Sequence, residues 1–331
     1  MSFGQVAALW RYPVKSLGGE QVEQIDIGTR GPHGDRLWAV RDLERDVTAT
    51  ARRIPKLLGA TARYVKPVAP DAGPGNAPEV EITFPDGTVC SSSDPDVHKK
   101  LSDLVDRDVR LTALPPADDT SLHKLSRDER ENMSIAALRK DFGIAEGEKF
   151  PDMSMFRVTD LTLLGRYSTP PGMFVDLAPV HVMTTTSLDT IGAELGGDPD
   201  ASRVDPRRFR PNILLALTNP SDGLPESQWT GGQLSLGGVV LDVTMPTIRC
   251  VVPSRAQPGG IEVDRRITKA VAGRAGRCLG SYCWVATDGT VSVGDEATLK
   301  EGKHRAFADA ARRTKRFAFG IATSAMERLG R

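Results

Sequence analysis

Short stretches in which apolar and polar residues alternate dominate the first hundred residues, and such alternation predicts β-strands. In the second stretch, for example, Val22, Ile25 and Ile27 mark the apolar positions. A Pro-Asp-Gly turn at 85–87 joins two predicted strands, and residues 66–78, rich in Pro, Ala and Gly, read as an exposed loop. The strands predicted in this part cover residues 5–11, 22–28, 36–40, 46–50, 79–84, 88–90 and 109–114.

Helical spacing replaces this alternation once, in the middle of the first half. The segment S-D-P at 93–95 offers a capping oxygen and a proline suited to a first helical turn. Val97, Leu101 and Leu104 then recur at helical spacing. Residues 115–147 are polar and charged, with a further helix expected around 128–131, so they read as a connector between two halves.

The second half returns to short strands with few helices between them. Turn signals such as Gly196-Gly197 and Gly231-Gly232 separate the runs. We predict strands over 161–164, 180–183, 213–217 and 239–243, and helices over 187–194 and 264–271. This order favours a β-barrel or sandwich over a doubly wound sheet, so the expected fold class is mainly β with some helix, α+β.

Length, charge and cysteine content narrow the class of protein. A chain of 331 residues allows about two domains. Its 43 basic and 43 acidic residues balance, which argues against a nucleic-acid binder. We expect no secretory signal and no membrane span, because the start lacks a signal pattern and no apolar run is long enough. Four cysteines are too few for a disulfide scaffold, so a reducing, cytoplasmic location is expected.

The last thirty residues are different in character. Residues 300–316 hold seven basic residues against two acidic ones, and Phe307, Ala311, Ala318 and Ile321 can share one helical face. One interpretation is a helix packed on the barrel with a solvated basic face. The other is a helix that docks on an anionic surface or partner.

General catalytic and metal motifs are missing from the sequence. There is no G-x-S-x-G, H-E-x-x-H or P-loop motif. Cys278 and Cys283 form C-x4-C without a second ligand pair, which gives little support for zinc, and no spacing suits an iron–sulfur cluster. The five histidines are isolated in sequence; His181, on an apolar strand, is expected to be a satisfied core residue.

Basic residues near turns and beside one cysteine remain as the candidate chemistry. Lys15 precedes a glycine pair, Asp35 stands next to Arg36, and Arg249 directly precedes Cys250. Arginines also crowd into the segment R-R-F-R-P-N at 207–212. Such cations, gathered in the fold, would suit an anionic ligand beside a thiolate and would lower that cysteine's pKa. Solvation, or pairing with acidic neighbours such as Asp205, is the expected state of Arg207 and Arg208.

Several segments, in one order along the chain, resemble the MOSC family. Those that resemble its N-terminal β-barrel domain are Y-P-V-K-S (12–16), G-D-R-L-W (34–38) and T-A-R (50–52). Those that resemble the MOSC domain are D-L-A-P-V-H (176–181), T-S-L (186–188), R-R-F-R-P-N (207–212), R-C (249–250) and V-S-V-G-D (291–295), the last as its closing strand. The arrangement is most similar to the mitochondrial amidoxime-reducing component and its bacterial relatives. It implies an N-terminal β-barrel domain at 1–114, a helical connector at 115–150, the MOSC domain at 151–298 and a basic helical tail at 299–331.

The resemblance implies a molybdenum–molybdopterin cofactor (Moco), with the sulfur of Cys250 as both metal ligand and catalytic group. Relatives carry Thr-Ser where this chain has Leu177 and Ala178, so contact there must run through the backbone. The implied cofactor-binding residues are Lys15, Ser16, Arg36, Leu177, Ala178, Arg210, Ile248, Arg249 and Cys250. Structural alternatives stand beside these roles: Cys250 as an inert buried thiol, and Lys15 and Arg36 as charges at the barrel rim.

The activity implied by the resemblance is the reduction of small N-hydroxylated substrates, amidoximes or hydroxylamines, by oxygen-atom abstraction at molybdenum. With no iron–sulfur cluster, haem or zinc expected in the chain, a separate ferredoxin-, flavin- or cytochrome-type protein would supply electrons, and the basic tail is a candidate docking element. The alternatives are a non-catalytic carrier of the cofactor, or of sulfur, and a degenerate barrel that binds neither.

Overall fold

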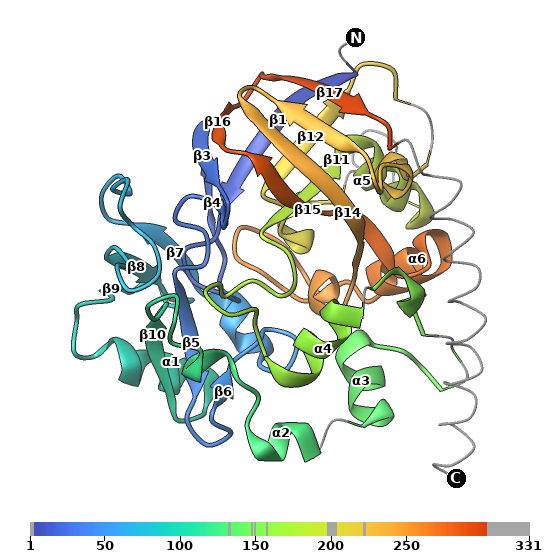
Figure 1. Cartoon of the computed structure of the whole chain (residues 1–331). Helices are drawn as coiled ribbons and strands as arrows, with labels where there is room; N and C mark the ends of the chain where they lie inside the picture. The colour runs from blue at the N-terminus through green and yellow to red at the C-terminus, as the bar shows by residue number, and fades with distance from the viewer. Residues whose placement is uncertain are drawn as a thin grey trace.

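A closed β-barrel forms the larger lobe of the molecule (Figure 1). The computed structural model describes residues 3–131, 134–146, 148, 150–156, 158–196, 204–220 and 223–302. The barrel strands are β1 (Gly4–Arg11), β11 (Val180–Thr184), β12 (Ile213–Leu217), β13 (Gln233–Leu236), β14 (Val239–Ile248), β15 (Cys278–Thr287) and β17 (Glu296–Lys300). They pair in the ring β1-β12-β11-β15-β14-β13-β17 and back to β1. Only β11 and β12 run parallel.

The barrel joins the two ends of the sequence. Strand β1 pairs with β12, with Leu9 beside Ile213, and β2 (Glu20–Val22) extends it on its other side. Side chains alternate between the interior and the outside along β14, as the period of a strand requires. The interior is filled by Val6, Leu9, Val180, Val182, Ile213, Leu215, Leu234, Leu236, Leu241 and Val243, among others. A small sheet of β3 (Gln24–Gly28), β4 (Gly31–Pro32) and β16 (Gly289–Ser292) lies against it.

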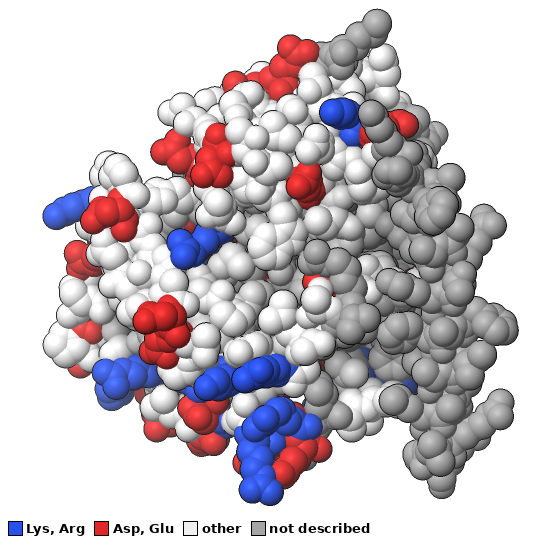
Figure 2. Space-filling view, viewed as in Figure 1, with Lys and Arg blue, Asp and Glu red and all other residues white. Residues whose placement is uncertain are grey.

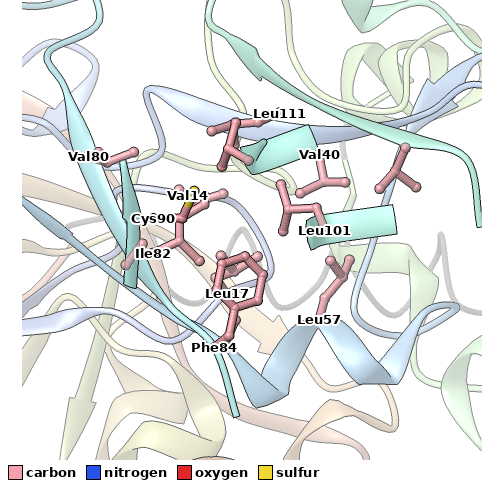
Figure 3. Close-up of a cluster of buried hydrophobic side chains, with 14 of the residues drawn as sticks. Val14, Leu17, Val40, Leu57, Val80, Ile82, Phe84, Cys90, Leu101 and Leu111 are labelled. Atoms are coloured by element: carbon pink, nitrogen blue, oxygen red, sulfur yellow. The ribbon is translucent and has the colours of Figure 1, made fainter. Parts of the chain in front are cut away.

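The smaller lobe holds two three-stranded sheets and one helix around its own core (Figure 3). Its elements are β5 (Trp38–Asp42), β6 (Val47–Thr48), β7 (Thr61–Tyr64), β8 (Val80–Thr83), β9 (Val89–Ser91), α1 (Val97–Val105) and β10 (Val109–Ala113). The predicted hairpin arms do pair, as β5 with β6. Val97 and Leu101 are buried and Leu104 packs against the core, so the helical stripe is confirmed. Cys90 is a buried member of this core.

Helices α5 (Thr185–Glu194) and α6 (Arg266–Ala275) cover one side of the barrel (Figure 1). Leu188 and Ile191 of α5 pack with Ile267 and Val271 of α6 against the outer face of the barrel. Helix α5 begins because the Thr184 side chain accepts a hydrogen bond from a backbone N–H of its first turn. The 3-10 turns are η1 (Pro55–Gly59), η2 (Ser121–His123), η3 (Met153–Met155), η4 (Pro206–Phe209), η5 (Pro225–Gln228) and η6 (Val252–Ser254).

The connector between the lobes contains α2 (Arg127–Glu131), α3 (Ile135–Phe142) and α4 (Val158–Arg166). The strand predicted at 161–164 is wrong, because these residues lie in α4; a short apolar run suits a helix as well as a strand. The closing strand predicted at 291–295 is also wrong. There β16 ends at Ser292, the chain turns at Gly294 with a positive φ, and β17 closes the barrel instead. The basic tail from 303 onward lies outside the described residues.

The observed fold class is therefore mixed α+β, built on a β-barrel, as predicted. None of the described helices is long and apolar enough to cross a membrane. Acidic and basic side chains are interspersed over the face drawn in Figure 2.

Candidate functional site

A cavity of about 470 Å³ is lined by all three parts of the chain. The smaller lobe contributes most of residues 42–54, the connector contributes one face of α3 and the end of α4, and the barrel contributes the loop after β14. The nine residues expected to bind the cofactor, scattered over more than two thirds of the sequence, all line this cavity. They are Lys15, Ser16, Arg36, Leu177, Ala178, Arg210, Ile248, Arg249 and Cys250.

Lys15 is positioned where the chain leaves β1 and enters the smaller lobe. Its backbone N–H donates to Trp38, its side chain is buried, and its Nζ lies 2.5 Å from Oδ1 of Asp176. Burial lowers the pKa of Lys15, although Asp176 opposes this. The surrounding cavity walls partly desolvate Asp176, which would raise its pKa, but Lys15 and Arg52 together hold that pKa well below its usual range. Because the Asp176 side chain is 65% exposed, it presents a carboxylate to the cavity beside the lysine.

Arg36 and Arg210 lie over one tyrosine ring. The guanidinium carbon of Arg210 is 4.2 Å from the ring centroid of Tyr12, and that of Arg36 is 5.4 Å away. Asp35, its neighbour in the sequence, accepts a hydrogen bond from Arg36 at 2.5 Å. Nη1 of Arg210 donates to the carbonyl of Leu17, whereas its buried Nη2 has no hydrogen-bond partner among the described residues. The pKa of Arg210 falls to about 10 because of burial.

Three of these side chains are held by strained backbone. Ser16, Arg36 and Arg210 have φ values of +73°, +52° and +54°, in the left-handed region that non-glycine residues rarely adopt. Such conformations persist where the surrounding structure over-determines them, and they cluster at ligand sites. The hydroxyl of Ser16 accepts a hydrogen bond from the backbone N–H of Ala51, so its own proton remains available to a ligand.

Arg249 is fixed by the barrel beside the cysteine. Its Nε donates to the carbonyl of Leu279 and its Nη1 to that of Phe209. Its Nη2 donates to Nε2 of His181 at 2.6 Å, and because Nε2 accepts, Nδ1 of His181 carries the proton and donates to the carbonyl of Arg210. Burial, aided by Arg249, lowers the pKa of His181 well below its usual value, so the ring is neutral. The expectation of a satisfied, buried histidine at 181 is confirmed, although this histidine also lines the cavity.

Cys250 follows β14 and precedes η6, half-buried against Ala51 and Val252. The neighbouring cations act on Cys250 in the expected direction, but the expected net lowering of its pKa is wrong. Burial raises the pKa of Cys250, and this outweighs the opposing effects of Arg52 and Arg249. In the free protein the group is therefore a thiol at neutral pH, and it needs a further positive centre to become a thiolate.

The charges that line the cavity are unbalanced. Nine are basic, and the acidic ones are Asp42, Glu129, Asp141 and Asp176. The basic ones are Lys15, Arg36, Arg45, Arg52, Arg53, Arg107, Arg208, Arg210 and Arg249. The chain as a whole is neutral, so the cavity concentrates positive charge. Together with the unpaired Nη2 of Arg210, this excess suits an anionic ligand.

Arg207 and Arg208 behave differently from each other. Arg207 pairs with Asp205 at 2.6 Å, as expected. Arg208 is not a solvated or ion-paired residue: it is buried and donates to the backbone carbonyls of Pro253, Arg255 and Glu262. It therefore holds the loop after Cys250 in place.

Asp176, Arg52 and Tyr282 are among the cavity side chains that the sequence did not single out. Asp176 and Arg52 both lie in segments that carried the family resemblance, so their place in a motif was the available signal. Tyr282 lies in β15, where no pattern singled it out. Burial raises the pKa of Tyr282 to about 12, so its hydroxyl is protonated at neutral pH and can donate to a ligand.

The other cysteines stand apart from the cavity lining. Cys90 and Cys283 are buried in the cores of the two lobes, and Cys278 is half-buried at the start of β15. Burial raises the pKa of Cys278 to about 12. Among the described residues, no group of three or more His, Cys, Asp or Glu side chains is arranged to hold a metal ion.

Two domain families match the chain in the order in which its lobes are built. The MOSC N-terminal beta barrel domain matches residues 3–98, and the MOSC domain matches residues 170–298. The chain therefore belongs to the MOSC domain proteins that also carry this N-terminal domain. A curated relative is the mouse (Mus musculus) mitochondrial amidoxime-reducing component 1, 24% identical over 323 residues, which cover 89% of this chain and 82% of the relative.

Solved structures with some similarity include two bacterial proteins. The YuaD protein of Bacillus subtilis has a TM-score of 0.41 and 12% identity, over 91% of this chain and 97% of that chain. YiiM from Geobacillus stearothermophilus has a TM-score of 0.28 and 15% identity, over 38% of this chain and 55% of that chain.

Proposed function

We propose that this chain binds a molybdenum–molybdopterin cofactor in the cavity and reduces small N-hydroxylated compounds, amidoximes or hydroxylamines. The observation that carries the proposal is the meeting of Cys250 with an excess of basic side chains in one cavity. Membership of the MOSC family supports the cofactor. The relative's description as an amidoxime-reducing component supports the substrate class.

The residues present fit such a cofactor. Molybdopterin carries a phosphate, and basic side chains outnumber acidic ones in the cavity lining; among them, Arg210 has a buried Nη2 with no partner among the described residues. A cavity of about 470 Å³ lies within the usual range for small-molecule sites. The lone thiol of Cys250 is a soft ligand that becomes a thiolate on binding a metal, which removes the effect of burial on its proton.

Each residue has a distinct task in this proposal. Lys15 and Arg36 supply charge to the phosphate and pterin, and the Ser16 hydroxyl supplies a donor. Arg210 completes its hydrogen bonds on the same anion, and Arg249 holds the backbone next to Cys250. Leu177, Ala178 and Ile248 contribute backbone groups and exclude water. When bound, the cofactor supplies two-electron redox chemistry at its metal.

Reduction of an N–O bond consumes two electrons and two protons and releases water. The chain must therefore receive electrons from outside, and we assign this task to a separate ferredoxin-, flavin- or cytochrome-type protein. Asp176 is the acidic side chain most open to the cavity, and it lies among Lys15, Arg36 and Arg52. Since these cations keep Asp176 ionised, its part is to orient Lys15 rather than to deliver a proton.

The test is turnover with a small chemical reductant in place of the donor protein. Protein from cells that make the cofactor should reduce benzamidoxime and hydroxylamine, and Cys250→Ala should abolish both reactions. Protein that holds molybdenum but reduces neither compound would instead indicate a non-catalytic carrier of the cofactor.

A further inference from the structure

One face of α3 borders the cavity with apolar side chains. Ala137, Leu138, Asp141 and Phe142 all line it. Their spacing places them on neighbouring turns of one helix face. Three of the four are apolar, so this side differs from the side around Arg36 and Arg210, where buried cations gather.

Helix α4 adds a partly exposed leucine to the same border of the cavity. Leu164 lines the cavity, and it is 37% exposed, as Leu138 on α3 is 38% exposed. Single exposed leucines are common on protein surfaces. Two from different helices on the border of one ligand cavity are a more specific arrangement, because a bound apolar group would remove both from water.

The position of α3 is fixed from two sides. Arg53 of the smaller lobe donates to Asp141 at 3.1 Å and to Glu129 of α2 at 2.5 Å. From the barrel, Arg277 donates to the carbonyl of Phe142 at 3.1 Å, at the negative end of the helix. Leu138 and Phe142 therefore form a wall held relative to the buried cations, not a free surface.

We propose that Leu138 and Leu164, together with Phe142, bind an apolar substituent of the substrate, so that the protein prefers N-hydroxylated compounds bearing an aryl-sized apolar group. The preference rests on the proposed function for its chemistry, but the binding of the apolar group does not. A substrate with a methyl group in that place leaves both leucines in water, whereas a phenyl group covers them.

The experiment compares benzamidoxime with acetamidoxime, which differ in phenyl against methyl. Calorimetric titration of the full chain, isolated from cells that make the cofactor, measures both dissociation constants for the wild type, Leu138→Ser and Leu164→Ser. Leu163→Ser is the matched control: the neighbouring residue of α4 is also 36% exposed, but it does not line the cavity.

We expect the wild type to bind benzamidoxime at least about 10-fold more tightly than acetamidoxime. Leu138→Ser and Leu164→Ser should each weaken benzamidoxime binding about 10-fold, equal to about 1.4 kcal/mol, and leave acetamidoxime within about 2-fold. Leu163→Ser should change neither constant. The same variants should shift kcat/KM for benzamidoxime by the same factor.

Equal affinity of the wild type for the two compounds would overturn the inference, as would an equal loss in Leu163→Ser or a parallel loss of acetamidoxime binding. These outcomes are read from affinity, so they are independent of turnover. A wild type that shows the affinity ratio and its loss in the two variants, but reduces neither compound, would contradict the proposed function and leave the apolar subsite standing.

Discussion

Replacing Arg210 with methionine should change the stability of the cofactor-free protein little, but the variant should lose most of its bound cofactor. Arg210 donates one hydrogen bond to the carbonyl of Leu17 at 2.5 Å and lies over the Tyr12 ring at 4.2 Å. Burial lowers the pKa of Arg210 from 12.5 to about 10. This shift corresponds to a free-energy cost of about 3 kcal/mol for keeping the charged guanidinium in the folded protein.

The opposing contributions nearly cancel in Arg210→Met. The change removes a penalty of about 3 kcal/mol and keeps apolar contact with Tyr12. It gives up a charged hydrogen bond of about 1.5–3 kcal/mol and a cation–π contact of about 1 kcal/mol. The free energy of unfolding should therefore change by no more than about 1 kcal/mol. Loss of a charged hydrogen bond to an anion should weaken cofactor retention about 10- to 100-fold.

Arg208→Met is the control, two residues earlier and also buried. Arg208 donates to the carbonyls of Pro253, Arg255 and Glu262 at 3.1, 3.4 and 2.7 Å. Its loss leaves these carbonyls without their donor, so the free energy of unfolding should fall by about 3 kcal/mol. Urea unfolding of cofactor-free protein and the molybdenum content of each folded variant measure the two effects. The reasoning is refuted if Arg210→Met loses about 3 kcal/mol and keeps a wild-type molybdenum content.

Three further predictions concern other parts of the chain. Burial lowers the pKa of His123 from 6.5 to about 4, so the stabilising effect of the neutral ring is complete above pH 6.5 and is lost as the pH falls toward 4. Urea unfolding should show that the wild type loses about 3 kcal/mol more than His123→Gln between pH 7 and pH 4, and parallel losses would contradict this. Gly280 has a φ of +81°, and Gly280→Ala would place a Cβ 2.4 Å from Nε2 of His181. Thermal unfolding should therefore show that the free energy of unfolding falls by about 2–4 kcal/mol, and an unchanged Tm would disprove the close contact. Replacing the tail residues Arg312, Arg313, Lys315 and Arg316, which lie outside the described residues, with alanine should slow turnover with a protein donor but not with a small chemical reductant; an unchanged rate with the protein donor would exclude the tail as a docking element.

Local pattern was enough to predict most strands, whereas the family resemblance was needed to select nine of the residues that line the cavity. Strand β1 lies within a residue of where alternation predicted it. Helix α1 carries the predicted apolar stripe but begins at Val97, later than the predicted start at 93–95, and its N-cap residue makes no side-chain capping bond. Strand β14 was predicted only to 243 but extends to Ile248, because register shifts along its pairing with β15 carry it past Pro246. Strand β15 was not predicted at all, since buried Ser281 and Gly280 break its alternation.

The electrostatics of the cavity depended on contacts that no local pattern encodes. Lys15 and Asp176 pair although 161 residues separate them. Counting cations near Cys250 predicted a lowered pKa, whereas its burial, a property of the whole fold, raises that pKa instead. The left-handed backbone of Arg210 likewise follows from its surroundings, because its residue type disfavours that conformation.

The molybdenum content of protein isolated from cells that make the cofactor tests the central proposal most directly. Elemental analysis should find stoichiometric molybdenum in the wild type and in Cys278→Ala, whose half-buried thiol does not line the cavity. Cys250→Ala should lose the metal. A wild type without molybdenum, or a Cys250→Ala variant with undiminished metal and unchanged metal coordination by X-ray absorption, would contradict the assignment.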